Sequence, residues 1–289
     1  MHLSSYIVKA RPGVLGGKHE EKRPLRQLSF LPVKRYVFIN RDSHPTANIY
    51  VAIHEAKNLP SPVPDYQVPH CHNTDEFYYF IGENPDLTGL EGQIIFEGKF
   101  HKIVSPACVY IPTGTVHEYK VTKGAGTVTV LFRDRGYTHE DKPFDHAKGE
   151  RDLARYASYI FSPDVRPTTE IKYHTDAAPG VRYVFVDGKL QPDAGFYTVV
   201  RSVANVTPTQ ANYVERHTHN CDTQHIAIGN GPELGGLKIE FQVEDKKTVV
   251  ESPVGVHIPA GMPHSQRIVE GSGQFFNFVP KANYNDGLV

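Results

Sequence analysis

The chain of 289 residues is 39% hydrophobic and 22% charged, with 31 basic and 32 acidic residues. This composition excludes a disordered chain, and the near-zero net charge makes nucleic acid a poor partner. No apolar run approaches the ~18 residues of a membrane span, and the first ten residues lack the order of a secretory signal. The three cysteines, Cys71, Cys108 and Cys221, are widely spaced and predict no disulfide framework, so we expect a cytoplasmic protein that binds no membrane.

The local sequence pattern predicts strands along most of the chain. Residues 1–34 contain a Gly-Gly pair and several basic residues, and we interpret them as an extended N-terminal arm. Short runs of β-branched and aromatic residues then alternate with Gly, Pro, Asn and Asp, which is typical of strands. The first of these runs span residues 36–39, 48–53, 77–81, 93–96, 108–111 and 127–132. Residues 145–161, with apolar side chains at near-helical spacing, predict one short helix in an otherwise all-β chain.

The sequence contains a tandem repeat without gaps. The segment 217–222 lies 147 positions after the similar segment 70–75, and Arg-Tyr-Val-Phe at 182–185 lies 147 positions after Arg-Tyr-Val-Phe at 35–38. The same offset relates two Ile-Pro pairs and several glycines, and a duplication explains such a constant register. The repeat divides the chain into four predicted parts: an arm (1–34), a first domain (35–133), a linker with the helix (134–181) and a second domain (182–289).

Four residues of the first copy form a candidate metal site. Side chains alternate between the two faces of a strand, so His70, His72 and Glu76 point the same way. A straight strand would spread them over ~20 Å, so a bend or a curl is needed to bring them together. His117 follows a Pro-x-Gly turn that can return it to the other three. Imidazole and carboxylate donors in this number suit a divalent transition metal.

These two segments carry a resemblance to a known family. His-x-His-x3-Glu over residues 70–76, followed by Pro-x-Gly-x2-His over residues 112–117, resembles the two motifs of the cupin superfamily. The two copies make the chain similar to a bicupin. The resemblance implies two tandem double-stranded β-helix (jelly-roll) domains, and a metal held by three histidines and one glutamate. The chain departs from the family pattern at Val121, where asparagine often follows the second motif.

The second copy keeps the histidines and loses the acid. His217, His219 and His264 align with the three histidines of the first copy, whereas Thr223 takes the place of the glutamate. Loss of the carboxylate removes a negative charge, which weakens the binding of a divalent ion. His225 has the strand parity to supply a fourth imidazole. Three interpretations stay open: a neutral histidine metal site, a metal-free pocket, and a remnant kept for packing.

Aromatic side chains of the first copy are candidates for a substrate pocket. Tyr78 and Phe80 continue the inward face of the strand that begins near the glutamate, and Tyr110 and Tyr119 are further candidates. An ion with three imidazoles and one carboxylate keeps open positions, where a substrate or O2 can bind. The sequence identifies no catalytic residue beyond the metal ligands.

By analogy with bicupins, we favour a metal-dependent dioxygenase, which is an oxidoreductase. Its substrate would be a small oxygen-bearing metabolite, either aliphatic or aromatic. We expect one divalent ion in the first domain, and we favour Fe2+ over Mn2+, Ni2+, Cu2+ or Zn2+. The sequence does not decide whether the second domain binds a second ion. The alternatives are a non-oxidative metal-dependent decarboxylase, lyase or isomerase, and a non-catalytic protein that binds a small molecule. Association into a homo-oligomer is compatible with the sequence.

Overall fold

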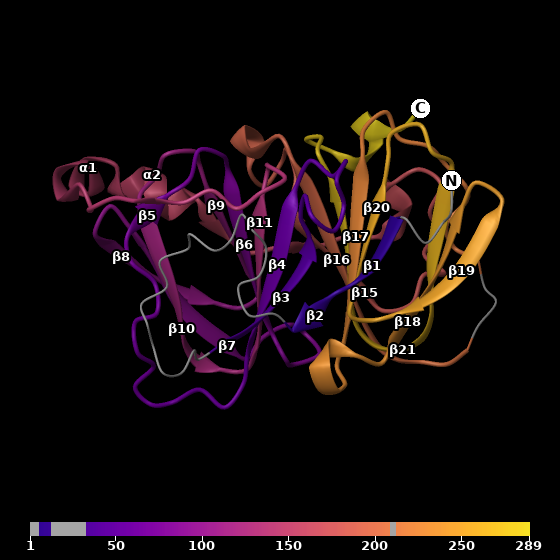
Figure 1. Ribbon diagram of the computed structural model, residues 1–289, viewed down its shortest axis with the longest axis horizontal. Helices are drawn as coiled ribbons and strands as arrows, with labels where there is room; N and C mark the ends of the chain where they lie inside the picture. The colour runs from indigo at the N-terminus through magenta and orange to yellow at the C-terminus, as the bar shows by residue number, and fades with distance from the viewer. Residues whose placement is uncertain (1–5, 13–32, 209–211) are drawn as a thin grey trace. The chain divides into compact units, whose positions relative to one another are not determined.

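Strands dominate the structure, and only two short α-helices occur in the part of the chain that is described (Figure 1). The computed structural model describes residues 6–12, 33–208 and 212–289. Most of the expected arm, residues 1–34, lies outside these ranges. The chain divides into an N-terminal unit (residues 12–42 and 48–162) and a C-terminal unit (residues 1–11, 43–47 and 163–289). Within the described ranges, no helix is long and apolar enough to cross a membrane.

The N-terminal unit is built from two antiparallel sheets. The seven-stranded sheet has the order β13 (Ile160–Phe161), β9 (Ala107–Ile111), β6 (Glu76–Gly82), β11 (Gly126–Phe132), β4 (Tyr50–Ala56), β3 (Val33–Ile39) and β2 (Arg11–Pro12). The five-stranded sheet has the order β12 (Glu140–Asp141), β5 (His70–Cys71), β10 (His117–Gly124), β7 (Leu90–Phe96) and β8 (Lys99–Val104).

Burial explains which of these strands the sequence predicted. Every residue of β4, β6 and β9 is buried, so these strands are nearly continuous apolar runs and were predicted. The predicted segments of β3, β7 and β11 also lie in strands. Apart from the two-residue strands, β8 and β10 were missed. Polar side chains interrupt both: β10 alternates buried and partly exposed residues, and only Ile103 of β8 is buried.

The single helix expected over residues 145–161 is two short helices, α1 (His146–Arg151) and α2 (Leu153–Ser158). The side chain of Asp145 caps α1 by accepting a hydrogen bond from the backbone N–H of Lys148 at 3.0 Å. Asp152 lies between the helices with φ −102° and ψ 13°, outside the helical region, and this residue interrupts the run. The buried Tyr156 of α2 stacks on Phe96 at 5.3 Å, which attaches the helix to the unit.

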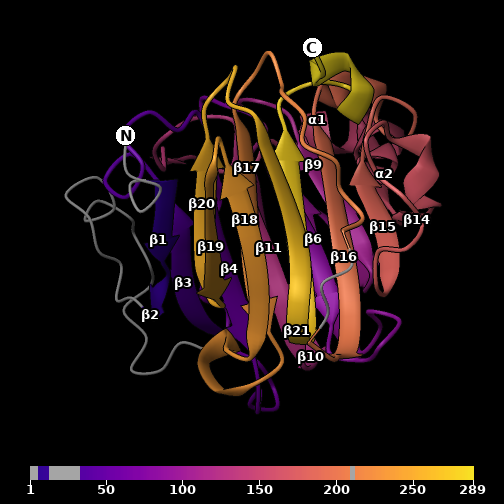
Figure 2. The ribbon, with the colours of Figure 1, turned by 90° about the vertical axis from the view of Figure 1, so that its right-hand side faces the viewer.

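The C-terminal unit is a nine-stranded antiparallel sheet that repeats the same plan (Figure 2). Its main path has the order β1 (Ile7–Lys9), β20 (Val254–Ile258), β17 (Thr223–Gly229), β21 (His264–Val279), β16 (Tyr197–Val206), β15 (Val181–Val186) and β14 (Asp164–Val165). β18 (Leu237–Val243) joins this path at β21, and β19 (Lys246–Glu251) pairs with β18. The described residues of this unit also include the 3-10 helices η2 (Thr168–Glu170), η3 (Pro192–Ala194), η4 (Pro232–Leu234) and η5 (Tyr284–Gly287).

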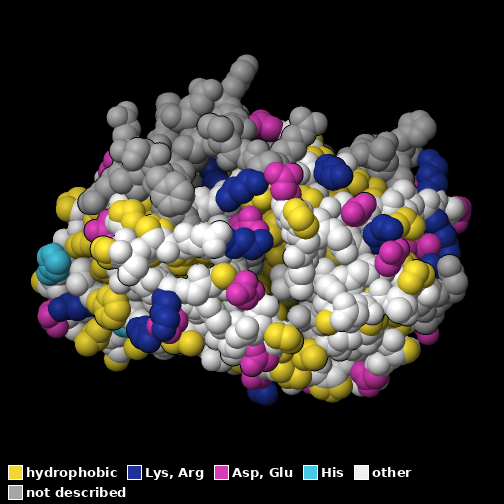
Figure 3. Space-filling view, turned by 90° about the horizontal axis from the view of Figure 1, so that it is seen from below, with side chains coloured by type: hydrophobic (Ala, Val, Ile, Leu, Met, Phe, Trp, Pro, Cys, Tyr) yellow, Lys and Arg dark blue, Asp and Glu magenta, His cyan; other side chains and the backbone are white. Residues whose placement is uncertain are grey.

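The surface is mixed in charge, as the composition predicts. On the face seen in Figure 3, lysine and arginine side chains are interspersed with aspartate and glutamate side chains. This face therefore offers no continuous basic surface in the part that is described, and it does not favour a polyanionic partner.

A pair of glycines at equivalent positions allows close strand packing in both units. Gly126 and Gly273 have φ angles of +150° and +152°, and a Cβ atom on them would lie 2.2 Å and 2.0 Å from the carbonyl oxygens of Ile81 and Ile228. We therefore expect Gly126→Ala to lower the free energy of unfolding of the N-terminal unit by at least about 2 kcal/mol, measured by urea denaturation. The control is Gly114→Ala, where φ is +75° but a Cβ atom meets nothing within 4 Å, so this variant carries backbone strain without the clash and should lose less. An equal loss in both variants would contradict the steric explanation.

Candidate metal centres

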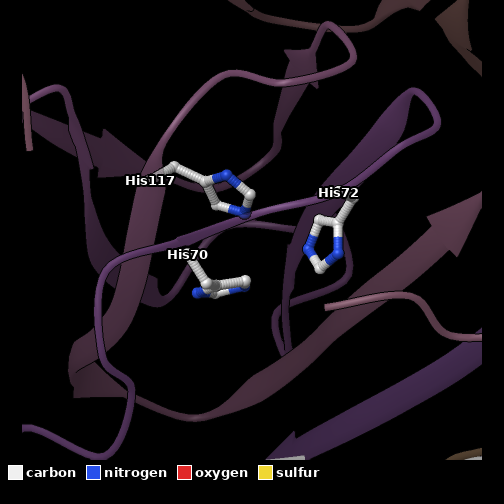
Figure 4. Close-up of side chains that lie close together, drawn as sticks. All are labelled: His70, His72 and His117. Atoms are coloured by element: carbon white, nitrogen blue, oxygen red, sulfur yellow. The ribbon is translucent and has the colours of Figure 1, made fainter. Parts of the chain in front are cut away.

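The four predicted ligands of the N-terminal unit lie together. His70 on β5 is the direct antiparallel partner of His117, the first residue of β10. The chain bends after His72, at residues 73–74, and Glu76 then begins β6, so the bend that the sequence required is present. All four side chains are buried, with at most 4% of any residue exposed. Figure 4 shows the three imidazole rings close together, with His70 and His72 from one segment and His117 from another.

The distances between donor atoms suit one ion. One ring nitrogen from each of His70, His72 and His117 lies within 4.8 Å of the others. Glu76 adds a carboxylate oxygen, Oε2, which lies 2.9 Å from Nε2 of His117 and 3.3 Å from Nε2 of His72. Three imidazole nitrogens and one carboxylate oxygen therefore converge on one buried point.

Hydrogen bonds to backbone carbonyl oxygens orient all three rings. Each Nδ1 atom faces a carbonyl oxygen, which only accepts, so each Nδ1 donates a hydrogen bond and each Nε2 is the nitrogen left to face the centre. The acceptors are Val68 for His70 (2.7 Å), Thr138 for His72, and Thr115 for His117 (2.9 Å). The rings are thus held with Nε2 toward the centre, which is the orientation that a metal ligand needs.

Buried polar atoms without a hydrogen-bond partner mark the centre of this cluster. They are Nε2 of His70, Nε2 of His72 and Oε2 of Glu76. Burial, with His117 and His72 nearby, lowers the pKa of His70 well below its usual value, so this ring is neutral. Burial alone would raise the pKa of Glu76, but the adjacent His72 and His117 lower it well below its usual range. Unpartnered imidazole nitrogens beside a carboxylate fit a divalent cation.

One of the four predicted pocket residues, Tyr78, contacts this cluster, and Tyr119 and Phe80 pack behind it. The hydroxyl of Tyr78 is 3.3 Å from Nε2 of His117, and the ring of Tyr119 lies 4.5 Å from the ring of Tyr78. Phe80 packs edge-on against Tyr119 at 6.1 Å. His54, which sequence reasoning did not single out, stacks on Tyr119, and its Nδ1 is hydrogen-bonded to the Tyr119 hydroxyl.

The structure does not bring Tyr110 to the cluster. In the sheet, Tyr110 is the direct partner of Phe77, whereas Glu76 pairs with Ile111. Because neighbouring residues of a strand face opposite sides, Tyr110 lies on the side away from Glu76. Its ring packs against Phe77 and Tyr159, so it is part of the core beyond the pocket.

Sequence reasoning missed two residues that cover the cluster, Tyr137 and His139. The ring of His139 stacks on His70 at 4.5 Å, and its Nε2 is 2.6 Å from a carboxylate oxygen of Asp141. The ring of Tyr137 lies 5.3 Å from His72. A signal was available, because the 147-residue offset continues beyond residue 133 and relates Tyr137 to Tyr284.

The C-terminal unit holds a second histidine group. Ring nitrogens of His217, His219 and His264 lie within 4.8 Å of one another, and all three residues are buried. Nδ1 of His217 and of His264 donate to the carbonyl oxygens of Glu215 (2.8 Å) and Met262 (2.9 Å). This arrangement repeats the first cluster for two of the three rings, while Nδ1 of His219 has no partner.

A tyrosine lies where the second group lacks its acid. Thr223 pairs with Ile258, as Glu76 pairs with Ile111, and its buried hydroxyl has no hydrogen-bond partner. The hydroxyl of Tyr284, on η5, lies 2.8 Å from Nε2 of His217 and 3.3 Å from Nε2 of His219. Burial raises the pKa of Tyr284 well above its usual value, so the phenol keeps its proton.

The structure does not bring His225 into the second group. Its ring stacks on Phe275 at 5.5 Å and lies 6.1 Å from the ring of His264. Both of its ring nitrogens are buried without a hydrogen-bond partner. Strand parity therefore placed this residue on the correct face, but too far along the strand to complete the group.

We expect His225→Phe to reduce the acid sensitivity of the protein. Burial, with His219 and His217 nearby, lowers the pKa of His225 to about 3. Between pH 6.5 and 3 the unfolded chain therefore binds a proton that the folded chain does not, so stability falls as pH falls through this window. At pH 5 the metal-free variant should retain about 2 kcal/mol more of its pH 7.5 unfolding free energy than the metal-free native chain. Urea denaturation at both pH values tests this, and identical pH dependence would contradict it.

Comparisons with known proteins identify the fold. No protein-family profile matches the sequence, and no curated protein matches it. A mutant form of oxalate decarboxylase from Bacillus subtilis is 12% identical, with a TM-score of 0.57 over 91% of this chain and 76% of that chain. Another structure of the same enzyme, from a study of its Mn(II) centres, is 13% identical, with a TM-score of 0.56 over 90% and 76%. Oxalate decarboxylases are bicupins.

This chain has the bicupin fold. The resemblance seen in the sequence and the predicted all-β class are therefore confirmed. The expected dioxygenase activity and the preference for iron gain no support from these neighbours, which are decarboxylases with Mn(II) centres. Two three-histidine groups, one in each unit, are compatible with divalent ions.

Proposed function

We propose that the N-terminal unit holds one divalent transition-metal ion, and that the protein is an enzyme that uses it for non-oxidative chemistry on a small carboxylate. The observation that carries this proposal is the convergence of unpartnered Nε2 atoms of His70 and His72 with the carboxylate of Glu76. Buried polar atoms without partners are rare in native proteins, and a cation would satisfy all of them at once. His117 completes the set.

The chain's own residues would prepare this centre. The carbonyl oxygens of Val68, Thr138 and Thr115 hold the rings with Nε2 inward, so little reorganisation is needed when an ion binds. When bound, such an ion polarises a substrate oxygen as a Lewis acid. Glu76 supplies a negative charge, which imidazole ligands cannot provide.

The aromatic side chains would shape the space beside the ligands. Tyr78, Phe80 and Tyr119 are each at most 2% exposed, so they exclude water from one side of the cluster. The Tyr78 hydroxyl is the polar group of this wall that lies nearest to His117, and it can donate a hydrogen bond to a substrate oxygen. His139 and Tyr137 cover His70 and His72 from another side.

The likeness in fold to oxalate decarboxylase supports the choice of reaction class. Decarboxylation, or a related lyase or isomerase step, requires an ion that stabilises negative charge on a substrate oxygen and requires no external oxidant. The Mn(II) centres of that enzyme make Mn2+ the first ion to test here. A dioxygenase would differ from such an enzyme in one measurable respect, because it consumes O2.

Anaerobic turnover tests the proposal. The full chain would be purified, analysed for bound metals, and loaded with Mn2+. A panel of small mono- and dicarboxylates would then be incubated with it under nitrogen, with CO2 release and product formation followed. We expect turnover without O2 that depends on the ion. Turnover that occurs only with consumption of O2 would overturn the non-oxidative assignment, and protein that binds no divalent ion would overturn the metal centre.

A further inference from the structure

The C-terminal unit contains a cavity outside the two histidine groups. Its volume is about 40 Å³, which exceeds the space that one water requires and admits a ligand of a few heavy atoms. Arg182, Arg201, Gln266 and Asn277 line it on the polar side. Its apolar side comes from the side chains of Ile171, Val199, Val214 and Phe275. A small amphipathic molecule would match such walls.

Arg201 brings a positive charge that the protein leaves without an acidic partner. It is 9% exposed, and its guanidinium donates to the carbonyl oxygen of Pro179 (3.1 Å) and to the hydroxyl of Thr168 (2.7 Å). Both acceptors are neutral, and in the described ranges no carboxylate forms an ion pair with it. Arg182, in contrast, reaches Glu170 at 3.3 Å. A buried guanidinium without a counter-ion favours an anionic ligand.

Two amide side chains add polar atoms to the same wall. The side-chain oxygens of Gln266 and Asn277 are buried without a hydrogen-bond partner. By turning over, an amide can present its NH2 group instead, and two such groups beside a guanidinium can donate to both oxygens of a carboxylate. Unpartnered amides facing a cavity are thus a second observation that points to a polar ligand.

The first copy of the repeat keeps the equivalent of Arg182, which is Arg35, but differs at the positions of Arg201 and Gln266. His54 stands 147 positions before Arg201, and Tyr119 stands 147 positions before Gln266. There, His54 is hydrogen-bonded to the Tyr119 hydroxyl, and the Tyr119 ring packs against Tyr78. The second copy has therefore exchanged a packed aromatic pair for a cation and an amide.

We propose that this cavity binds a small aliphatic monocarboxylate of about two to four carbon atoms, a size set by the cavity volume. The carboxylate lies at Arg201, Gln266 and Asn277, and the short hydrocarbon part packs against Val199 and Phe275. The site is independent of the proposed chemistry in the N-terminal unit. It adjoins the second histidine group, because His174 lines the cavity and its ring lies 5.3 Å from the ring of His217.

Calorimetric titration of the full chain with propionate tests the site. Propionamide serves as the neutral probe of equal size, and inorganic phosphate as an anion of different shape. We expect propionate to bind at least about tenfold more tightly than either. Charge-assisted hydrogen bonds to the guanidinium distinguish it from propionamide, and contact with the apolar wall distinguishes it from phosphate. Equal binding of propionamide, or tighter binding of phosphate, would overturn the assignment to a monocarboxylate.

Variants of Arg201 test whether propionate binds in this cavity. The double variant Arg201→His with Gln266→Tyr introduces the pair that the first copy already accommodates, so we expect it to fold and to lose at least about tenfold in propionate affinity. Arg201→Gln should show a similar loss with less change in shape. The matched control is Lys189→Gln, which removes one positive charge from a side chain that is 77% exposed, and it should bind as the native chain does. Unchanged propionate binding in both Arg201 variants would place the ligand elsewhere and refute the proposal.

Discussion

Replacing Glu76 with glutamine should lower the affinity of the N-terminal unit for Mn2+ by at least about 100-fold and abolish the turnover that depends on it. Loss of residues that merely support a metal ligand commonly costs 10- to 100-fold in affinity, and Glu76 supplies the only negative charge among the four donors. Glutamine preserves the size of the side chain, so the change isolates the charge. Metal content after dialysis against known free Mn2+ concentrations, together with turnover, measures the effect.

The matched control is Glu55→Gln, the same change at another buried acid of the same unit. Glu55 pairs with Lys57 and accepts a hydrogen bond from the Tyr36 hydroxyl, and it does not contact the histidines. This variant should keep its metal content. If the glutamine variant at position 76 also retained full metal content and full turnover, Glu76 could not be a ligand.

Introducing an acid into the second histidine group should have the opposite effect. We expect Thr223→Glu to raise the affinity of the C-terminal unit for Mn2+ by at least about tenfold, because it adds a carboxylate at the position that Glu76 occupies in the first unit. Thr223 is 1% exposed, and its hydroxyl has no partner that the change would deprive. Elemental analysis should then show one further equivalent of Mn2+ at concentrations where the native second group is empty.

Thr223→Gln separates charge from size in this experiment. It adds a side chain of the same length without the negative charge, so the metal affinity of the second group should rise much less than with glutamate. Equal gains in both variants would mean that added bulk, and not the carboxylate, changes the group. No gain in either would indicate that Tyr284, beside His217 and His219, prevents a fourth donor from reaching the ion.

The repeat made much of the fold and of the first site predictable. Strand parity and a Pro-Gly turn are local properties of the chain, and they were sufficient to group His70, His72, Glu76 and His117. The bend between His72 and Glu76 followed from distance alone, because a straight strand could not bring these side chains together.

What remained hidden depends on pairing between distant segments. Tyr110 faces away from the site because the register of β6 and β9 sets Phe77 opposite it, and no local pattern specifies that register. His139 reaches His70 because β12 returns to pair with β5, where Asp141 is the direct partner of His70. The packing of the complete sheet determines such long-range pairings, so they cannot be predicted from the sequence of each strand alone.

The short strand Ile7–Lys9 determines how the C-terminal unit can be isolated. It pairs with Val254–Ile258, so one flank of that strand is protected by residues from the opposite end of the chain. A fragment that starts at Pro163 would leave the backbone N–H and C=O groups on this flank open, and open strands recruit other chains. We therefore expect such a fragment to self-associate, and a peptide of residues 6–11 added in trans to suppress that aggregation.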